Sequence, residues 1–233
     1  MATIGGPDNI IEDGLVFYMD AANTDSYTSG SNTISNLLGP ETGSVNNNVS
    51  FESSNAGILT WDGSDSQVEL GTPNILMDGM VGSYSISLWV KSSDTSNTPA
   101  LFGNNTTNWA QYYKFSIYVS SNKPIFAALV PNQKECIAQT KEINDGIWHN
   151  IVATYNNSVN GGEMKIYIDK FLDKTVTSAG TSPTTDRNNT LYWGSRSSIQ
   201  ELNGSMACVS VYHKALSQLE INQNYNALKG RFI

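Results

Sequence analysis

The sequence has few cysteines, few charges and no long apolar run, and each shortage excludes a class of protein. Cys136 and Cys208 are the only cysteines among 233 residues, and each lies in an apolar run, so we expect buried free thiols and no disulfide framework. No apolar run is long enough to span a bilayer. The first residues carry neither a basic cluster nor an apolar core, so we expect no secretory signal.

Basic residues are scarce as well. Lys and Arg number 13 against 21 Asp and Glu, and the net charge of -8 repels phosphate backbones and anionic lipid headgroups. Nucleic acids and membrane surfaces are therefore not expected as partners. Charged residues make up 15% of the chain, against roughly 25% in a typical domain, and short neutral side chains take their place. Such a surface is typical of glycan binders and of extracellular or virion proteins.

Runs of β-branched and aromatic residues, broken by Asn, Ser and Gly, predict strands along most of the chain. The clearest pair is residues 148–155 and 163–169, a hairpin with one buried face. Further strands are expected at residues 15–20, 84–91, 115–119, 125–130, 135–140, 190–194 and 206–212, with 135–140 antiparallel to 125–130. The Asp62-Gly63 turn between two apolar runs predicts a second hairpin. Residues 21–48 predict a long surface loop with at most one short strand.

One helix is specified, close to the C-terminus. Ser217 and Glu220 form a capping box, and Leu216 with Ile221 forms a hydrophobic staple, so the helix begins there; Gly230 ends it. Strands at regular spacing with this single helix predict an all-β fold, an antiparallel two-sheet sandwich with one short C-terminal helix. Residues 1–12 predict an extended N-terminal arm, and residues 13–233 predict the sandwich.

Several segments resemble laminin-G-like domains of the concanavalin A-like lectin/glucanase group, in the correct order. They are residues 14–21, 59–65, 84–90, 147–155 with 166–169, and 203–207 with 212–221. The resemblance implies a concanavalin A-like jelly-roll sandwich over residues 13–233. Residues 223–232 and the Gly-Pro arm also resemble the versions found in virion structural proteins of tailed phages. Since the family has no single function, the resemblance supports the fold more than the activity.

The sequence shows no pair of carboxylates with the arrangement that glycoside hydrolysis needs. Glycoside hydrolases of this fold need two acidic residues facing one sugar, and the nearest pairs here are Asp65 with Glu69 and Glu163 with Asp169. Solvation of turns and strand edges is the better explanation of both pairs. His149 has no nucleophile motif near it, and we expect a structural hydrogen bond to a neighbouring loop. We therefore expect no enzyme.

Four aspartates could bind calcium. Asp20, Asp62, Asp65 and Asp145 lie in loops where the resemblance implies that carboxylates and backbone carbonyls can form calcium sites. Asx turns explain the same residues without a metal. No cofactor is required, and calcium stays an alternative.

Aromatic residues beside asparagines suit a sugar, because an indole plane packs on the ring face and amides bond its hydroxyls. The first set comprises Trp109, Asn104, Asn105, Asn108, Tyr112 and Tyr113, and the second comprises Trp193 and Arg196. The alternative is that Trp109 packs a loop onto the core. Trp61, Trp89 and Trp148 lie within strands and are expected in the core.

Together these features predict a non-enzymatic structural or adhesion protein of a phage virion, either a capsid decoration or a fibre component, with weak glycan binding. Its partners would be other virion proteins, copies of itself and cell-surface glycans, and it would be assembled into the virion in the host cytoplasm. Attachment would depend on residues 1–12 or 229–233. A free carbohydrate-binding module is the alternative, and a glycoside hydrolase is less favoured.

Overall fold

The computed structural model describes residues 9–46, 48–77, 82–96, 98–103, 115–130, 132–180, 190–196 and 200–233. Its first sheet contains β1 (Leu15–Asp20), β4 (Ser50–Glu52), β5 (Ile58–Asp62), β7 (Tyr84–Lys91), β12 (Trp148–Asn156), β13 (Glu163–Ile168), β14 (Phe171–Thr177) and β16 (Asn203–Tyr212). The second contains β2 (Thr33–Ser35), β3 (Thr42–Asn46), β6 (Gln67–Gly71), β8 (Ala100–Gly103), β9 (Phe115–Ser120), β10 (Lys123–Val130), β11 (Asn132–Ile137) and β15 (Leu191–Trp193). The helical segments are η1 (Ser54–Ala56), α1 (Asn74–Met77), α2 (Gln218–Leu228) and η2 (Lys229–Arg231).

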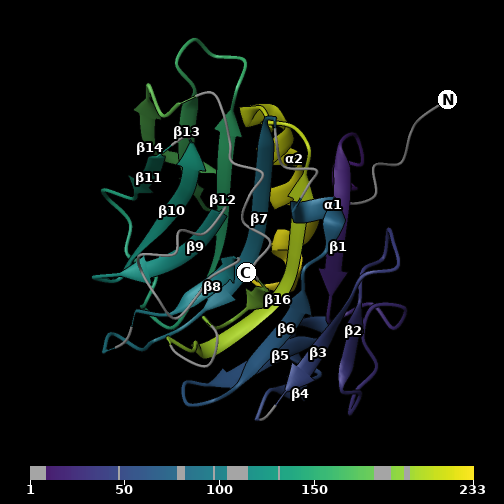
Figure 1. The fold of residues 1–233 in the computed structure, drawn as a ribbon. Helices are drawn as coiled ribbons and strands as arrows, with labels where there is room; N and C mark the ends of the chain where they lie inside the picture. Colours follow the sequence, from purple (N-terminus) through teal and green to yellow (C-terminus); the bar gives the residue numbers. More distant parts are fainter. Residues whose placement is uncertain are drawn as a thin grey trace, which may run out of the picture.

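The two sheets pack face to face (Figure 1). The strand order of the first is β14-β13-β12-β7-β16-β5-β4, with β1 beside β16; that of the second is β11-β10-β9-β8-β15-β6-β3-β2. Every strand pair recorded in the described residues is antiparallel. The predicted all-β antiparallel sandwich with a short C-terminal helix is confirmed, and α1 adds a single further turn.

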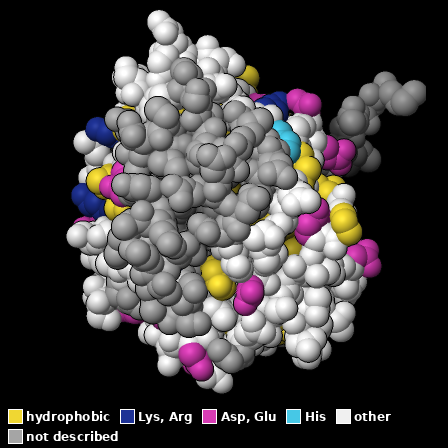
Figure 2. Space-filling model, viewed as in Figure 1, with side chains coloured by type: hydrophobic (Ala, Val, Ile, Leu, Met, Phe, Trp, Pro, Cys, Tyr) yellow, Lys and Arg dark blue, Asp and Glu magenta, His cyan; other side chains and the backbone are white. Residues whose placement is uncertain are grey.

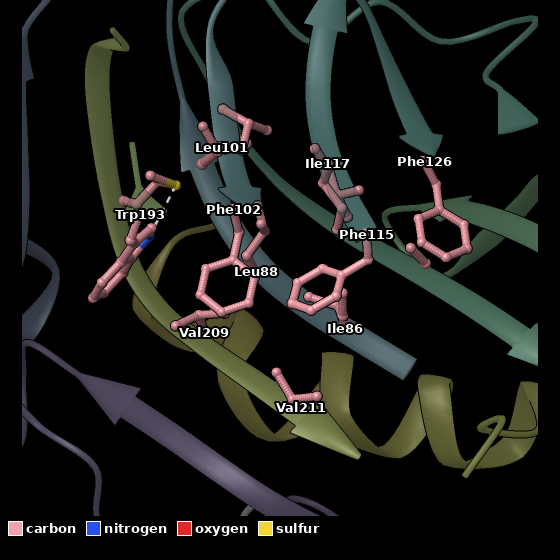
Figure 3. Close-up of a cluster of buried hydrophobic side chains, with 14 of the residues drawn as sticks. Ile86, Leu88, Leu101, Phe102, Phe115, Ile117, Phe126, Trp193, Val209 and Val211 are labelled. Atoms are coloured by element: carbon pink, nitrogen blue, oxygen red, sulfur yellow. Dashed lines mark hydrogen bonds between the residues drawn. The ribbon is translucent and has the colours of Figure 1, made fainter. Parts of the chain in front are cut away.

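A hydrophobic core fills the space between the sheets (Figure 3). Alternate residues of each strand point into it, as a pleated strand requires. Phe102 lies between Phe17 and Phe115, with ring centroids 6.2 and 5.9 Å away. The residues labelled in Figure 3 are Ile86, Leu88, Leu101, Phe102, Phe115, Ile117, Phe126, Trp193, Val209 and Val211.

The outer face of the first sheet is also buried, because α2 and the chain end lie across it (Figure 1). Trp89 is 1% exposed and stacks on Phe232 and Tyr225, with ring centroids 4.3 and 5.4 Å away. The polar residues on this face are bonded as well: the Ser85 hydroxyl donates to the carbonyl of Lys214 at 2.8 Å. The expected burial of Trp61, Trp89 and Trp148 is confirmed.

An ion pair anchors the last residues. Both terminal nitrogens of Arg231 bond the carboxylate of Asp20, at 2.8 and 3.1 Å, and Arg231 Nε donates to the carbonyl of Asn55 at 3.2 Å. The side-chain amide of Asn55 donates in return to the carbonyl of Arg231. Residues 229–233 are therefore docked on the sandwich, which differs from the expectation that they are free to join a neighbouring molecule.

The Asp62-Gly63 turn joins two sheets, so the predicted hairpin is wrong. β5 pairs with β4 and β16, whereas β6 pairs with β3 and β15. Both strands point apolar side chains into the same core, Trp61 from one and Val68 from the other, and the chain crosses between the sheets to achieve this. Turn residues in the sequence cannot distinguish a hairpin within one sheet from a crossing between two sheets, because both need the same reversal of the chain.

Further elements differ from the sequence prediction, among them the short strands β4 and β8, which were not expected. Residues 21–48 contain the hairpin of β2 and β3 at the edge of the second sheet, and Tyr27 and Ile34 are buried, so this segment belongs to the core rather than to a surface loop. β14 was not expected. It begins with the exposed Phe171 and Leu172 and has a register shift opposite Ile166 and Tyr167, so it lacks regular alternation.

α2 ends at Leu228, and Gly230 lies within η2 instead of ending the helix; the strand predicted at residues 135–140 is β11, which begins and ends three residues earlier. Other predictions of local structure are confirmed. β12 and β13 form the central hairpin, and the Ser217 capping box is present, with Leu216 and Ile221 buried in one cluster. The cysteines are free and buried, and burial raises the pKa of the Cys136 thiol to about 12. None of the described helices has the length and hydropathy needed to cross a membrane.

Residues 1–8 of the predicted arm lie outside the described residues. The last part of the arm contacts α2: the Ile11 amide donates to Asn224 Oδ1 at 2.7 Å, and Gln223 Nε2 donates to the carbonyl of Asn9 at 2.9 Å. Ile11 packs against the cluster beneath the helix. The arm therefore joins the domain from residue 9 onward.

Candidate functional site

Trp109, Asn104, Asn105, Asn108, Tyr112 and Tyr113 all lie outside the described residues. Their contact with a glycan stays a prediction.

The second predicted set lies inside the protein. Trp193 is 0% exposed, its indole donates to the sulfur of Met206 at 3.2 Å, and its ring lies 5.6 Å from that of Trp61. A ligand platform at Trp193 is wrong, because no face of the indole reaches the surface. Arg196 is buried too, and its Nη1 donates to Gln200 Oε1 at 3.1 Å. Its predicted contact with a ligand stays a prediction.

Of the predicted calcium residues, Asp62 and Asp65 lie at one turn, whereas Asp20 and Asp145 lie in other parts of the sandwich. The carboxylate of Asp20 is occupied by Arg231, so calcium at Asp20 is wrong. Asp62 and Asp145 each accept the backbone amide two residues on, at 3.0 and 3.2 Å, which is the Asx-turn alternative. Asp65 Oδ1 accepts from the amide of Asn48 at 3.3 Å. Among the described residues no group of three His, Cys, Asp or Glu is placed to hold a metal.

His149 connects three segments, as a structural residue would. Its Nδ1 lies 2.7 Å from Asp169 Oδ2, in the β13–β14 turn, and its Nε2 lies 3.0 Å from Asp145 Oδ1, in the loop before β12. Burial lowers the pKa of His149, but the hydrogen bonds and charges of the two aspartates outweigh burial and raise it above 6.5. Since ionised carboxylates only accept, an imidazolium that donates from both nitrogens satisfies this geometry.

A groove lies between the edges of the two sheets. Its volume is about 470 Å³, within the range of ligand-binding clefts. β10 and β11 form one wall and β14 forms the other, and Figure 2 shows basic and hydrophobic side chains together on this edge, at the left. The lining residues are Lys123, Glu135, Ile137, Ala138, Gln139, Lys174 and Val176.

The groove has an apolar floor and a polar rim. Ile137 is 46% exposed and Val176 is partly buried, so both present hydrocarbon to a ligand. Lys123 Nζ donates to the carbonyl of Gln139 at 2.8 Å, and Glu135 Oε1 accepts from the hydroxyl of Tyr118 at 2.8 Å. This arrangement supplies hydrogen-bond donors and acceptors around a surface on which an apolar ring face can lie.

Asp173 fixes the end of the groove. Its carboxylate accepts from the backbone amides of Gln139, Thr140 and Lys141, and so joins the end of β11 to β14. Burial raises the pKa of Asp173, but the hydrogen bond from the Thr140 hydroxyl and those from the three backbone amides outweigh burial and lower it. A second hollow of about 280 Å³ continues beyond Asp173, beside the 68% exposed Phe171.

The sequence analysis did not find this groove. Its walls come from strands some 35 to 50 residues apart along the chain, and β14 was not predicted. Charge patterning was the available signal: residues 115–180 hold six of the 13 basic residues and six of the 21 acidic ones. This segment is therefore neutral within an acidic chain.

The two-sheet sandwich and its edge groove are now defined, and a family model assigns the fold. The model described as the concanavalin A-like lectin/glucanases superfamily matches residues 62–222, more than half of the chain. The chain belongs to this superfamily. The predicted laminin-G-like, concanavalin A-like jelly-roll fold is confirmed. A curated relative, the Sushi, von Willebrand factor type A, EGF and pentraxin domain-containing protein 1 of Rattus norvegicus, is 35% identical over 105 residues. This match covers 41% of the chain and 3% of that protein.

Solved structures of the superfamily fold include binding domains and an enzyme. Domain 4 of AbnA, an extracellular arabinanase from Geobacillus stearothermophilus in complex with arabinotriose, is 20% identical with a TM-score of 0.64, covering 93% of this chain and 100% of that one. Botulinum neurotoxin type C, whose cell entry depends on two ganglioside molecules, is 19% identical with a TM-score of 0.69, covering 92% and 51%. A sialidase from Trypanosoma rangeli is 10% identical with a TM-score of 0.68, covering 96% and 34%. At these identities the likeness shows the fold alone.

Proposed function

We propose that this superfamily domain is a non-enzymatic glycan-binding module. The groove between β11 and β14 carries the proposal, because it offers an apolar floor at Ile137 and Val176 beside hydrogen-bonding groups on Lys123, Gln139 and Lys174. The full-length match to an arabinanase domain solved with arabinotriose supports it. So does a surface rich in short neutral side chains.

Binding without hydrolysis is favoured by the positions of the acidic residues. Glu163 and Asp169 lie at opposite ends of β13, roughly 20 Å apart at about 3.3 Å per residue, which exceeds the roughly 5–9.5 Å needed by glycosidase carboxylates. Glu163 pairs with Lys165 at 2.6 Å, and Asp169 bonds His149. Both carboxylates therefore have structural partners.

A glycan array followed by titration of the strongest hit tests the proposal. Replacing Ile137 by Ala removes apolar floor and should weaken binding by roughly fivefold, about 1 kcal/mol for lost hydrocarbon contact. Ile147→Ala is the matched control, since Ile147 is 53% exposed and lies outside the groove lining. Equal affinity of both variants, or no binding to any saccharide, contradicts the proposal. Loss of binding in Trp109→Ala alone would assign the site to the loop of residues 104–113.

A place on a phage virion is the more specific proposal, and it rests on the sequence resemblance of residues 223–232 and of the Gly-Pro arm. The docking of residues 229–233 favours the N-terminal arm as the segment that joins a neighbour. Deletion of residues 1–8 should abolish co-sedimentation with particles and leave the melting temperature unchanged. Wild-type occupancy of particles by the shortened chain would contradict attachment through the arm.

A further inference from the structure

The edge groove lies in a neutral stretch of an acidic chain, and we infer that it binds saccharides through a carboxylate of the sugar. The inference rests on the proposed glycan-binding function and names the class of ligand. All lining residues fall within residues 115–180, where six basic and six acidic residues cancel. The other seven basic and 15 acidic residues account for the whole net charge of -8. The segment that forms the groove therefore adds no net negative charge to repel an anionic ligand.

Two lysines line the groove, and each has ammonium N–H donors that can hydrogen-bond a ligand. Lys123 Nζ donates to the carbonyl of Gln139 at 2.8 Å, which holds the ammonium at the rim and leaves two further donors. Lys174 lies on the opposite wall, on β14, and has no carboxylate within ion-pair distance among the described residues. An ammonium on each wall suits an anion that lies between them.

The number of charges favours a single carboxylate over a sulfate or phosphate cluster. Glu135 lines the same groove and accepts a hydrogen bond from the hydroxyl of Tyr118. Two lysines and one glutamate give the groove lining a net charge of +1. Asp173 lies beside the groove, and its carboxylate accepts hydrogen bonds from the backbone amides of residues 139–141. A sugar ring on Ile137 and Val176 would place one acidic group at the lysines.

The test compares acidic saccharides with their neutral counterparts by calorimetric titration at low and physiological salt. Tetragalacturonate is paired with its methyl ester, and sialyllactose with lactose, so the two pairs distinguish a uronate from a sialate. The acidic member of one pair should bind roughly tenfold more tightly, as for a charged hydrogen bond, and salt should reduce the difference. Lys174→Gln and Lys123→Gln should each remove most of this preference, because each lowers the affinity for the acidic form far more than the affinity for the neutral form. Lys229→Gln, a change at an exposed lysine outside the groove, should have no effect.

The outcomes separate this inference from the proposed function. Equal binding of acidic and neutral forms by the wild-type chain overturns the carboxylate inference and leaves the glycan-binding proposal standing. Tighter binding of a sulfated heparin disaccharide than of either acidic sugar also overturns it. Absence of binding to every saccharide overturns both. Thermal melting of each variant verifies the fold, and the comparison on the wild-type chain needs no variant.

Discussion

Replacement of Arg231 by Met should strongly destabilise the protein, because it breaks the ion pair that anchors the C-terminus. Arg231 and Asp20 form a bidentate pair whose side chains are 18% and 9% exposed. Removing one partner of a buried pair leaves an uncompensated charge and costs about 3–5 kcal/mol. The remaining donors to Asp20, the hydroxyl of Tyr18 and the amide of Ala22, favour the lower end of that range.

A loss of about 3 kcal/mol corresponds to a decrease in melting temperature of roughly 6–12 °C for a chain of this size. Differential scanning calorimetry measures it, with Lys229→Met as the matched control, since Lys229 is exposed and should change stability by less than about 0.5 kcal/mol. The double variant Asp20→Asn with Arg231→Met should be more stable than the sum of the single changes predicts, because no lone charge remains. Equal melting temperatures for Arg231→Met and Lys229→Met would refute the reasoning.

Two further predictions concern the other buried contacts. His149 has a folded-state pKa above 6.5, so its stabilising effect is complete below pH 6.5 and declines as the pH rises through the folded-state value. The melting-temperature difference between wild type and His149→Gln should therefore shrink from pH 5 to pH 9; a difference that grows with pH contradicts the protonated bridge. Phe232→Ala uncovers Trp89 and should cost about 3 kcal/mol or more. The emission maximum of tryptophan should move to longer wavelength, and an unchanged maximum and melting temperature would show that Phe232 does not cover the sheet.

The sequence predicts those parts of the fold whose signals are local. The capping box at Ser217 fixes the start of α2, and the alternation of Met164, Ile166 and Ile168 fixes the buried face of β13. The crossing at Asp62-Gly63 was mistaken for a hairpin because the turn residues are the same in both cases. Only the pairing of β5 with β16 and of β6 with β15 distinguishes them, and that information lies far along the chain.

The candidate site could not be predicted for the same reason. Ile137 and Val176 come together because β11 and β14 are the edge strands of two sheets that lie side by side. No motif in the sequence joins these positions. Trp193 illustrates the opposite error: it was predicted to contact a glycan, whereas its position in β15 places it on the core face, beside Trp61.

The most direct test of the groove as a glycan site is a map of backbone amide chemical shifts during titration with the strongest hit of the glycan array. Binding in the groove predicts the largest changes at Ala138, Gln139 and Val176, and none at Ile147, which lies outside the groove lining. Saturable changes confined to residues outside the groove, or no saturable change with any saccharide, would contradict it.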